Sequence, residues 1–517
     1  MKERGTVLSR SGAAVAVAAL LLAAPLAAGA VERGGKLVAT SQVKVTSMDP
    51  VNGNAYGGTE GVVYLAVYER LVRQNEAGEF VPELAESWEL APDGKSITFK
   101  LRQGVTFHDG TPFDAAAAKF NLDRLLDPEE ATQAYRLYPD YAGTDIIDDH
   151  TIRVNLKNPS SIIMPGLTYK GGLMMSPTAY KELGEDIARH PVGTGPFVFE
   201  DWVPGDHVSL KKNPNYWQIG EDGEPLPYLD EIVIRVIAKD SVAVVELQTG
   251  RAQLTKRIPA ESLEDIRSDT DLELIEAPSA IMYRLYLNMR QPPFDNLKLR
   301  QAINYALDRQ AMAEAILPGT GYVQPFILLP SEPSYWDYTP YSYDPEKAQQ
   351  LMNEAGFGDG LDVEFMMINR EPDIQIAPAV QAFLQQIGIN TEIVSLERLI
   401  YVDRATSGNF EIAMAQTNLP LPTAVTWLQQ QLASDGPVNR AAWKNAEFDA
   451  LVAKLAAEMD PAAQEKLLHE IQQIVLDDAG QTFLFAAQSY DGASAKLHGV
   501  EYQHEGVWRL TDAWLED

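Results

Sequence analysis

The sequence contains no cysteine, and this absence excludes several kinds of chemistry at once. No disulfide can hold the fold together, and no thiol can act as a nucleophile, a soft metal ligand or a point of lipid attachment. Histidine is also scarce: there are seven, and none has a second histidine at the helical pair spacing that is typical of zinc sites. We therefore expect no bound metal and no cofactor.

Catalytic motifs are missing too. The sequence has no GxSxG elbow, no HExxH and no acidic cluster with metal-ligand spacing. It also lacks fixed-period repeats, low-complexity tracts and linkers rich in Gly and Ser. A secreted hydrolase is therefore only a remote alternative, and a scaffold or adhesion protein is not indicated.

Basic residues are few in comparison with acidic ones. The chain has 42 Lys and Arg against 73 Asp and Glu, a formal net charge of −31. Such a surface repels nucleic acid and anionic lipid, so neither is expected as a partner. The charge weakly favours neutral or cationic ligands, although solvation of an acidic surface explains it equally well.

The first thirty residues have the layout of a secretory signal peptide. Lys2, Arg4 and Arg10 precede or open an alanine-rich apolar run, which closes on small residues ending at Ala30. The alternative is a transmembrane anchor, but the run is too short and too rich in alanine for that. We expect cleavage near Ala30, which removes three basic groups and one acid and changes the net charge from −31 to −33. The product would be soluble and periplasmic, without a lipid anchor.

Beyond Ala30, strand and helix patterns alternate, which indicates an α/β chain of two or three domains. Alternating apolar residues predict strands at 97–101, 151–156, 197–199 and 232–237. Helical periodicity predicts one helix over 295–317, ended by Pro318 and Gly319, and another that begins after Asp460 as N-cap.

The stretch FHDGTPFDAAAAKF, residues 107–120, raises the question of whether His108 and Asp109 belong to a catalytic or metal site. Asp109 and Gly110 supply turn residues, and Asp114 is placed to cap a helix over 115–126. A catalytic or metal role would need a second ligand or base in reach, and the other histidines lie far apart in the sequence. A structural role for His108 is the favoured interpretation.

Residues 84–125, LAESWELAPDGKSITFKLRQGVTFHDGTPFDAAAAKFNLDRL, closely resemble the signature of the extracellular solute-binding proteins of family 5. Further marks of that family follow in order: HPVGTGPFVFEDW (190–202), LKKNPNYW (210–217), ELQTGRAQL (246–254), LRQAINYALDRQAM (299–312) and YDPEKAQQLMNEAGF (343–357). These proteins are the peptide, nickel and oligosaccharide receptors of ABC importers. Within the second mark, Gly193 and Gly195 suit a sharp crossing of the chain into a strand, whereas Pro196 argues against a phosphate loop.

The resemblance implies a fold similar to the type II periplasmic binding proteins, with two lobes joined by two hinge strands and an additional inserted domain. Domain I would comprise 31–56, 190–280 and 487–517, domain II 57–189, and domain III 281–486. The chain would cross between the lobes near 278–281 and 485–488, and closure would bury the ligand between them.

The function implied is that of a receptor that captures a peptide or peptide-like polar solute and delivers it to a membrane permease, acting as a monomer. In peptide-binding members, an aspartate of domain III holds the ligand's ammonium, and aligned without gaps its place is taken here by Pro420. No residue from 412 to 434 carries a charge. A buried ammonium without a countercharge is costly. Either another acid meets it, such as Glu397, Asp373 or Glu60, or the ligand is a modified peptide, an opine-like conjugate, an oligosaccharide or a chelated metal.

The candidate ligand-binding residues have amide, hydroxyl, aromatic or charged side chains, and some of them lie at or near the expected crossings between the lobes. Each has an alternative role in the core, in a loop or at the solvated surface. The candidates are Asn54, Tyr56, Ser279, Arg284, Arg370, Glu397, Thr417, Asn418, Trp427 and Gln488.

Overall fold

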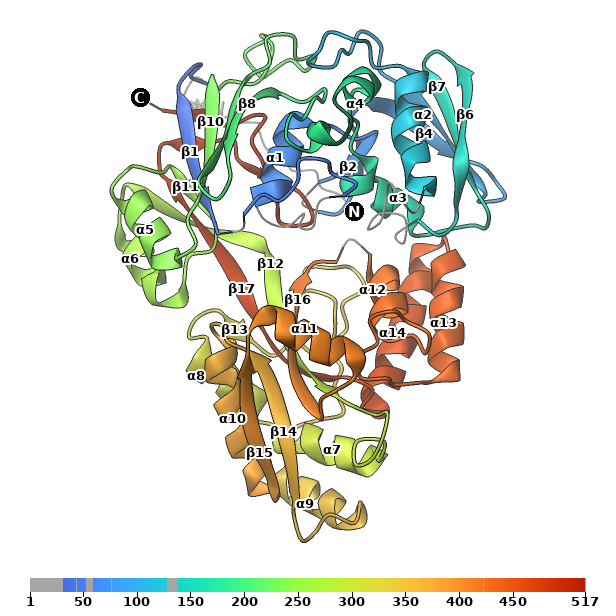
Figure 1. Cartoon of the computed structure of the whole chain (residues 1–517), viewed down its shortest axis with the longest axis vertical. Coiled ribbons are helices and arrows are strands. Elements are labelled where there is room, and N and C mark those ends of the chain that lie inside the picture. Colours follow the sequence, from blue (N-terminus) through green and yellow to red (C-terminus); the bar gives the residue numbers. More distant parts are fainter. Residues whose placement is uncertain are drawn as a thin grey trace, which may run out of the picture. The chain divides into compact units, whose positions relative to one another are not determined.

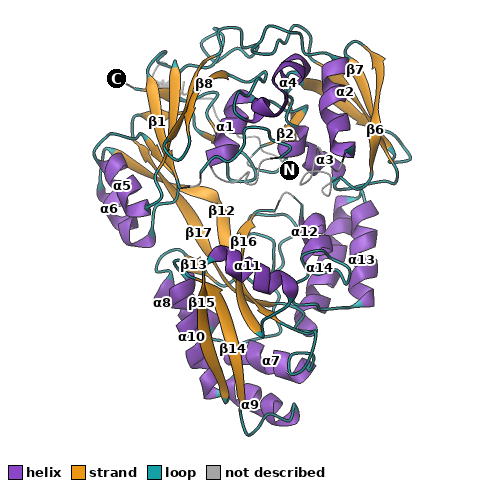
Figure 2. Cartoon of the chain, viewed as in Figure 1, coloured by secondary structure: helices purple, strands orange, loops and turns teal. Residues whose placement is uncertain are grey.

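The structure is a computed structural model of the chain, and it describes residues 31–42, 44–52, 59–75, 77–127, 138–421 and 423–516. By their contacts the residues form two compact units, 1–31 and 32–517. All helices and strands of the described residues belong to the second unit. Figure 1 shows the chain with its elements labelled, and Figure 2 shows the distribution of helices and strands.

A large mixed sheet runs through this unit in the order β15-β14-β16-β12-β17-β11-β1-β10-β9-β8, with β13 pairing β17. Its strands are β1 (Lys36–Ser41), β8 (Phe197–Val203), β9 (His207–Lys212), β10 (Glu231–Val236), β11 (Leu254–Thr255), β12 (Leu272–Leu287), β13 (Gly321–Tyr322), β14 (Leu361–Ile368), β15 (Ile389–Leu396), β16 (Ile412–Leu419) and β17 (Thr482–Ser494). The strands expected at 197–199 and 232–237 are therefore confirmed as parts of β8 and β10.

A separate antiparallel sheet has the order β4-β5-β7-β6 and packs on α2. Its strands are β4 (Ala85–Leu90), β5 (Ser96–Leu101), β6 (Tyr141–Asp148) and β7 (Thr151–Leu156), and short pairs are formed by β2 (Val72–Gln74) with β3 (Phe80–Pro82), β18 (Leu497–His498) with β21 (Trp514–Leu515), and β19 (Glu501–Tyr502) with β20 (Trp508–Arg509). β5 and β7 confirm the strands expected at 97–101 and 151–156.

Helices alternate with strands along the described residues, in keeping with the α/β class, and Figure 2 shows both kinds of element. The helices are α1 (Thr59–Val67), α2 (Ala115–Asp123), α3 (Ile163–Leu167), α4 (Pro177–Leu183), α5 (Asp240–Gln248), α6 (Leu263–Ser268), α7 (Leu297–Ala306), α8 (Arg309–Ile316), α9 (Pro345–Glu354), α10 (Asp373–Gln386), α11 (Arg398–Ser407), α12 (Ala424–Gln431), α13 (Ala446–Ala457) and α14 (Pro461–Asp477).

The helix expected over 295–317 is in fact two helices, α7 and α8. Leu307 has extended backbone geometry, and the Asp308 side chain caps α8 by accepting a hydrogen bond from the backbone N–H of Ala311. The apolar periodicity continues across the break because both helices pack on one core cluster, through residues such as Ile303 and Met312. Periodicity alone therefore concealed the break. For α14, in contrast, the expected N-cap is confirmed, since Asp460 accepts from Ala463 N–H at 3.1 Å.

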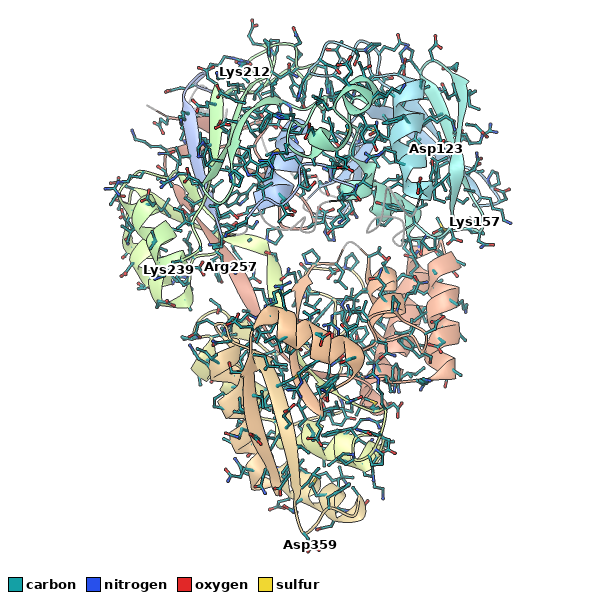
Figure 3. The ribbon with its side chains drawn as sticks, in the orientation of Figure 1. Asp123, Lys157, Lys212, Lys239, Arg257 and Asp359 are labelled. Carbon is teal, nitrogen blue, oxygen red and sulfur yellow. The ribbon has the colours of Figure 1, made fainter. Side chains whose placement is uncertain are left out.

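Two long strands, β12 and β17, pair with each other antiparallel from Leu272 opposite Ser494 to Leu285 opposite Thr482. Figure 1 shows them side by side, running from the region of β11 to that of β16. Their register is interrupted between Glu276 and Ala280, where the ladder has a bulge. Next to this interruption, Arg257, labelled in Figure 3, donates its backbone N–H to Asp491 of β17 at 2.8 Å.

Separate apolar cores lie on either side of these strands. One gathers around β1, β10 and α1, with Leu37, Ile232 and Tyr64 almost fully buried. Others lie between β14, β16 and helices α7 to α10, and between β12 and helices α12 to α14. The four-stranded sheet and α2 have their own core, which includes Phe99 and Leu122. Several cores in one chain are expected when a chain is too long for one.

The glycines of the GTGP stretch allow the backbone to approach the end of α1 closely. The Gly195 N–H donates to the Val67 carbonyl at 2.9 Å. A Cβ at Gly193 would lie 2.1 Å from the Val67 oxygen, and one at Gly195 would lie 2.6 Å from the Ala66 oxygen. Any larger residue would collide with backbone here, so the two glycines permit the packing of this crossing.

His108 has the structural role that its surroundings in the sequence favoured. Its Nε2–H donates to the Gly195 carbonyl at 2.9 Å, and its Nδ1 accepts from the Gly193 N–H at 3.4 Å. Asp109 accepts from the Thr111 backbone and from the Ser176 hydroxyl, and Asp114 caps α2 through the Ala117 N–H. The imidazole is thus held as a neutral tautomer that joins two loops.

Acid should destabilise the protein through His108. Burial lowers the pKa of His108 from 6.5 to about 4, so the folded state excludes a proton that the unfolded chain binds as the pH falls through 6.5. Its contribution to stability is complete above pH 6.5 and is lost progressively toward pH 4. We expect a loss of about 2 kcal/mol in the free energy of unfolding between pH 7 and pH 5 from this group alone.

Urea unfolding of the wild-type protein and of His108→Gln at both pH values measures this effect. The variant has no imidazole to titrate at this position, so its stability should fall less on acidification, while all other groups titrate alike. Equal losses in the two proteins would show that His108 does not carry the acid sensitivity.

Candidate binding site

Three parallel strands end at one edge of the large sheet, and each is followed by a helix. β14 pairs with β15 and with β16 in parallel, and the three strands end at Ile368, Leu396 and Leu419. Helices α10, α11 and α12 begin within a few residues of these ends. In open α/β sheets, ligands bind outside the carboxyl ends of the strands, and helix amino termini there favour a negative group. This edge is the candidate binding site.

Arg370 lies at this edge, between the end of β14 and the start of α10. Its Nε donates to Asp373 Oδ2 at 3.0 Å, and the side chain is 27% exposed. Within the described part of the chain, its two terminal nitrogens have no hydrogen-bond partner, so they can receive a carboxylate. The forked guanidinium suits such a bidentate contact.

Asp373, the partner of Arg370, is fully buried in the first turn of α10. Burial raises the pKa of this carboxyl group, and Arg370 lowers it in part. Among the described atoms, its Oδ1 has no hydrogen-bond partner. Asp373 therefore holds Arg370 in place and also leaves one carboxylate oxygen unused beneath the site.

Arg284, Thr417 and Trp427 are brought together in a buried polar cluster below the end of β16. Arg284 is 2% exposed, and its Nε donates to Thr417 Oγ1 at 3.1 Å. Its guanidinium carbon lies 5.0 Å from the centre of the Trp427 ring. The terminal nitrogens donate to neutral groups that the sequence did not single out: Gln481 at 3.0 Å, Tyr286 at 3.0 Å and Gln431 at 3.3 Å.

No carboxylate within the described residues lies in ion-pair distance of Arg284. The cation is held by neutral acceptors and by two aromatic rings, a set of contacts that tolerates burial of a guanidinium better than of an ammonium. Its close partners are buried except Gln431, which is partly buried, so the cluster contributes positive potential rather than an open contact surface. Sequence patterns do not indicate this arrangement, because an arginine in a strand is usually at the surface.

Ser279 and Gln488 line a cavity of about 590 Å³ beside the bulge of β12. The Gln488 side chain donates to the carbonyl oxygens of Ala277 at 2.6 Å and Ser279 at 3.3 Å, and so bridges the gap in the ladder. Tyr322, which also lines this cavity, has a buried hydroxyl group without a partner among the described atoms. Because Leu419 pairs with Ala280, the cavity adjoins the end of β16.

The remaining candidates are dispersed. Asn418 is exposed on β16, and Glu397 is exposed immediately before α11. Pro420 is buried at the end of β16. Glu60, considered as an acid for a ligand amine, is 0% exposed and accepts from the backbone and hydroxyl of Thr46. Asn54 and Tyr56 lie outside the described residues, and none of these contacts tests their role.

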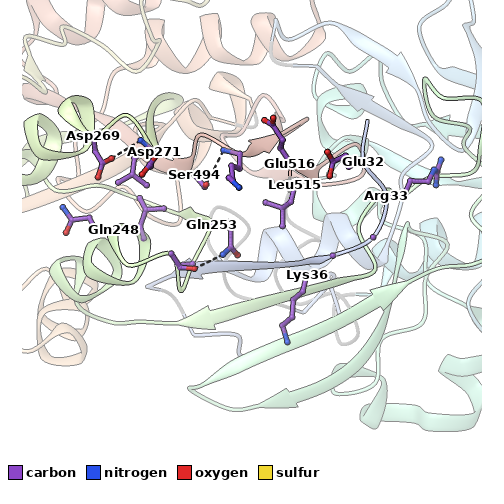
Figure 4. Close-up of a pocket in the computed structure, with 17 residues that line it drawn as sticks. Glu32, Arg33, Lys36, Gln248, Gln253, Asp269, Asp271, Ser494, Leu515 and Glu516 are labelled. Carbon is purple, nitrogen blue, oxygen red and sulfur yellow. Dashed lines mark hydrogen bonds between the residues drawn. The ribbon is translucent and has the colours of Figure 1, made fainter. Parts of the chain in front are cut away.

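A larger cavity of about 620 Å³, drawn in Figure 4, lies at the amino end of β1. It is lined by residues such as Arg33, Lys36, Asp271 and Glu516, with charges of both signs. In open α/β sheets, in contrast, ligands bind at the carboxyl ends of the strands. We therefore do not assign the ligand to it.

Metal-binding clusters and membrane-spanning helices are both missing from the described residues. In that part of the chain, no group of three or more His, Asp or Glu is placed to hold a metal ion. No helix there has the length and apolar character needed to cross a membrane.

Comparisons with known proteins agree with this geometry. A family model described as bacterial extracellular solute-binding proteins, family 5 Middle, matches residues 79–439. The glutathione-binding protein GsiB of Salmonella paratyphi A is 32% identical over 520 residues, covering 97% of this chain and 98% of the relative. The periplasmic binding protein DppA of Helicobacter pylori, solved with the peptide STSA, superposes with a TM-score of 0.80 at 28% identity over 94% of this chain and 99% of its own. A dipeptide-binding protein of Pseudoalteromonas shares the fold, with a TM-score of 0.81 at 23% identity over 93% of this chain and 100% of its own.

Proposed function

Because the chain belongs to the bacterial extracellular solute-binding proteins of family 5, we propose that it captures a small peptide-like solute with a free carboxylate, of the glutathione type, for an ABC importer. The observation that carries this proposal is the edge where β14, β15 and β16 end, with Arg370 as its partly exposed cation.

Arg370 would receive the ligand's carboxylate through its two terminal nitrogens. Asp373 fixes the guanidinium from one side, and the amino end of α10 adds a favourable potential for an anion. A fixed fork loses little freedom on binding, which favours affinity.

The amine side of the ligand has a different environment. Residues 412–434 carry no charge. In an alignment without gaps, Pro420 takes the place of the aspartate that the family's peptide receptors have. An ordinary peptide ammonium would lack a countercharge there. In a γ-glutamyl compound such as glutathione, the ammonium stands on the same carbon as a carboxylate, so the head group partly neutralises itself. This chemistry fits an uncharged β16 end better than a conventional peptide terminus does.

Binding would be coupled to closure of two lobes about β12 and β17. The bulge between Glu276 and Ala280, bridged by the Gln488 side chain, is suited to bending because few ladder hydrogen bonds cross it. The domain limits proposed from the sequence, with crossings near 278–281 and 485–488, are consistent with this bulge. A ligand that contacts both lobes shifts the population toward the closed state, which the permease then recognises.

The remaining parts of the proposal concern the setting of the protein. It would act as a monomer in the periplasm after removal of the first thirty residues, without a lipid anchor, because the chain has no cysteine. It would release its ligand unchanged, as a receptor rather than an enzyme. Oligosaccharides, opine-like conjugates and chelated metals are the alternative ligands.

A thermal unfolding screen followed by calorimetric titration tests the ligand class. We expect reduced glutathione and related γ-glutamyl peptides to raise Tm by several degrees and to bind more tightly than ordinary dipeptides to pentapeptides of similar size. The physical reason is that a ligand of the native state stabilises it by mass action, by about 2.7 kcal/mol at a hundredfold excess over Kd.

An oligosaccharide, agropinic acid and a nickel–histidine chelate serve as comparison ligands in the same screen. Stronger stabilisation by ordinary peptides would overturn the inference drawn from Pro420. Stabilisation only by a sugar or a chelate would overturn the proposal that the ligand is a peptide-like solute with a free carboxylate. Turnover of any bound candidate would overturn the receptor assignment.

A further inference from the structure

A small cavity of about 240 Å³ lies away from the candidate binding site, at a place where three guanidinium groups converge. Arg73 comes from β2 and Arg102 from the residue after β5, whereas Arg509 comes from β20 near the carboxyl end. Trp217 and Glu83 also line the cavity. In a chain with a net charge of −31, three arginines around one cavity are a marked local exception.

Arg509 is largely neutralised by its own neighbours. Its NH1 lies 2.9 Å from Glu501 Oε2 and 2.6 Å from Asp512 Oδ2, and its NH2 donates to Gln218 at 3.1 Å. The side chain is 7% exposed, so it forms a rigid wall. One oxygen of the Glu83 carboxylate is engaged elsewhere, since Oε2 accepts from the backbone N–H of Arg70 at 2.8 Å and from the Arg70 Nε at 3.3 Å.

Arg102 is fixed in orientation but keeps donors to spare. Its guanidinium carbon lies 4.3 Å from the centre of the Trp217 ring, and its Nε donates to the Glu83 carbonyl at 2.5 Å. Among the described residues, its terminal nitrogens have no hydrogen-bond partner. A planar guanidinium held against a ring, with its outer edge free, is well prepared to receive an oxyanion.

Arg73 is the least compensated of the three. Its nearest carboxylate is Glu501, at 3.9 Å, and that side chain is 44% exposed and already pairs with Arg509. Burial and then the charge of Arg509 lower the pKa of Arg73, and Glu83 and Glu501 only partly oppose this. A negative group placed in the cavity would relieve both effects.

We propose that this cavity binds a small oxyanion, phosphate or a compact carboxylate, between Arg73 and Arg102, with Arg509 as the wall. The bound anion would join segments far apart in the sequence, because Arg73 and Arg102 precede residue 190 whereas Trp217 and Arg509 follow it. It would thus act as an ionic clamp between the residues of the four-stranded sheet region and the carboxyl-terminal strands. None of these residues belongs to the carboxyl edge of β14, β15 and β16, so the site is separate from the proposed solute site.

Thermal unfolding and calorimetry at constant ionic strength test the clamp, with sodium phosphate and sodium citrate as probes against a sodium chloride background. We expect a saturable rise of Tm with one of the two anions in the wild-type protein. Arg73→Gln should weaken the apparent affinity by about tenfold or more, because a charge-assisted hydrogen bond is lost. The matched control is Arg153→Gln, which removes an exposed arginine of β7 and should leave the affinity unchanged.

The two probes distinguish the source of the anion: saturation by phosphate alone indicates a phosphate-type ligand, and saturation by citrate indicates a carboxylate. Should Arg73→Gln fail to fold, Arg102→Gln and direct titration of the wild-type protein provide the same comparison. The absence of saturable binding by either anion, or equal responses of Arg73→Gln and Arg153→Gln, would overturn the proposal.

Discussion

Replacing Arg370 by glutamine is expected to weaken the binding of glutathione about 30- to 100-fold and also to lower Tm of the unliganded protein. The expected loss corresponds to about 2 to 3 kcal/mol, the usual contribution of a charged, forked contact to a carboxylate. The loss of stability follows from Asp373, whose buried carboxylate loses the ion pair with the Arg370 Nε when the guanidinium is removed. Isothermal titration of the purified protein measures the affinity directly.

Two comparisons give this result its meaning. Arg267→Gln removes an exposed arginine of α6 and should bind glutathione like the wild-type protein. A ligand in which the carboxylates are amidated should bind the wild-type protein weakly and should bind Arg370→Gln no worse than that. If Arg370→Gln retains wild-type affinity for glutathione, the carboxyl edge of β14 does not hold the ligand's carboxylate.

Arg284→Ala is expected to lower the free energy of unfolding by at least about 3 kcal/mol. Removal of the guanidinium leaves the side-chain oxygens of Gln481 and Thr417 without their donor, whereas Gln431 still accepts from the Tyr286 hydroxyl, and each buried unsatisfied group costs about 1 to 3 kcal/mol. The faces of Trp427 and Tyr286 lose a cation as well, and the missing side chain leaves a void. Relief from burying a charge opposes these losses but does not restore the hydrogen bonds.

Urea unfolding with Arg284→Lys as the companion variant separates charge from geometry. A lysine keeps the charge but has one ammonium group where the guanidinium reaches four acceptors, so we expect most of the loss to persist. Arg398→Ala, at an exposed position of α11, should change the stability by no more than about 0.5 kcal/mol. Wild-type stability of Arg284→Ala would show that the cluster contributes little to the fold.

Local structure could be predicted from the sequence wherever a single residue type has one dominant backbone use. Asp114 and Asp460 were recognisable as N-caps because each precedes a clear helical pattern. Each side chain accepts a hydrogen bond from the backbone N–H of the residue three positions later. Asp308 also caps a helix, α8, but the continuous apolar stripe of α7 and α8 led to the prediction of a single helix. The α/β class and the family resemblance were predictable from several such patterns in order along the chain.

The candidate site was less accessible to sequence reasoning, because burial and partners depend on tertiary packing. Arg370 was recognisable from its place before a helix. The partners of Arg284, in contrast, come from Tyr286, Gln431 and Gln481, which lie up to 197 residues away in the sequence. Trp427 was expected at the ligand but is 8% exposed and packs over Arg284, and its contact with a ligand remains a prediction. The cavity beside Arg73 carried no sequence signal at all, since its three arginines belong to distant segments.

The pairing of β12 with β17 also has a consequence for how the molecule is made. Leu272 pairs with Ser494, so the two strands are separated by most of the second half of the chain. A nascent polypeptide therefore cannot complete its central sheet until almost its last segment has been synthesised, and topologies of such high contact order fold slowly. A chain that folds so late stays unfolded for longer, and passage through a narrow membrane channel requires an unfolded chain.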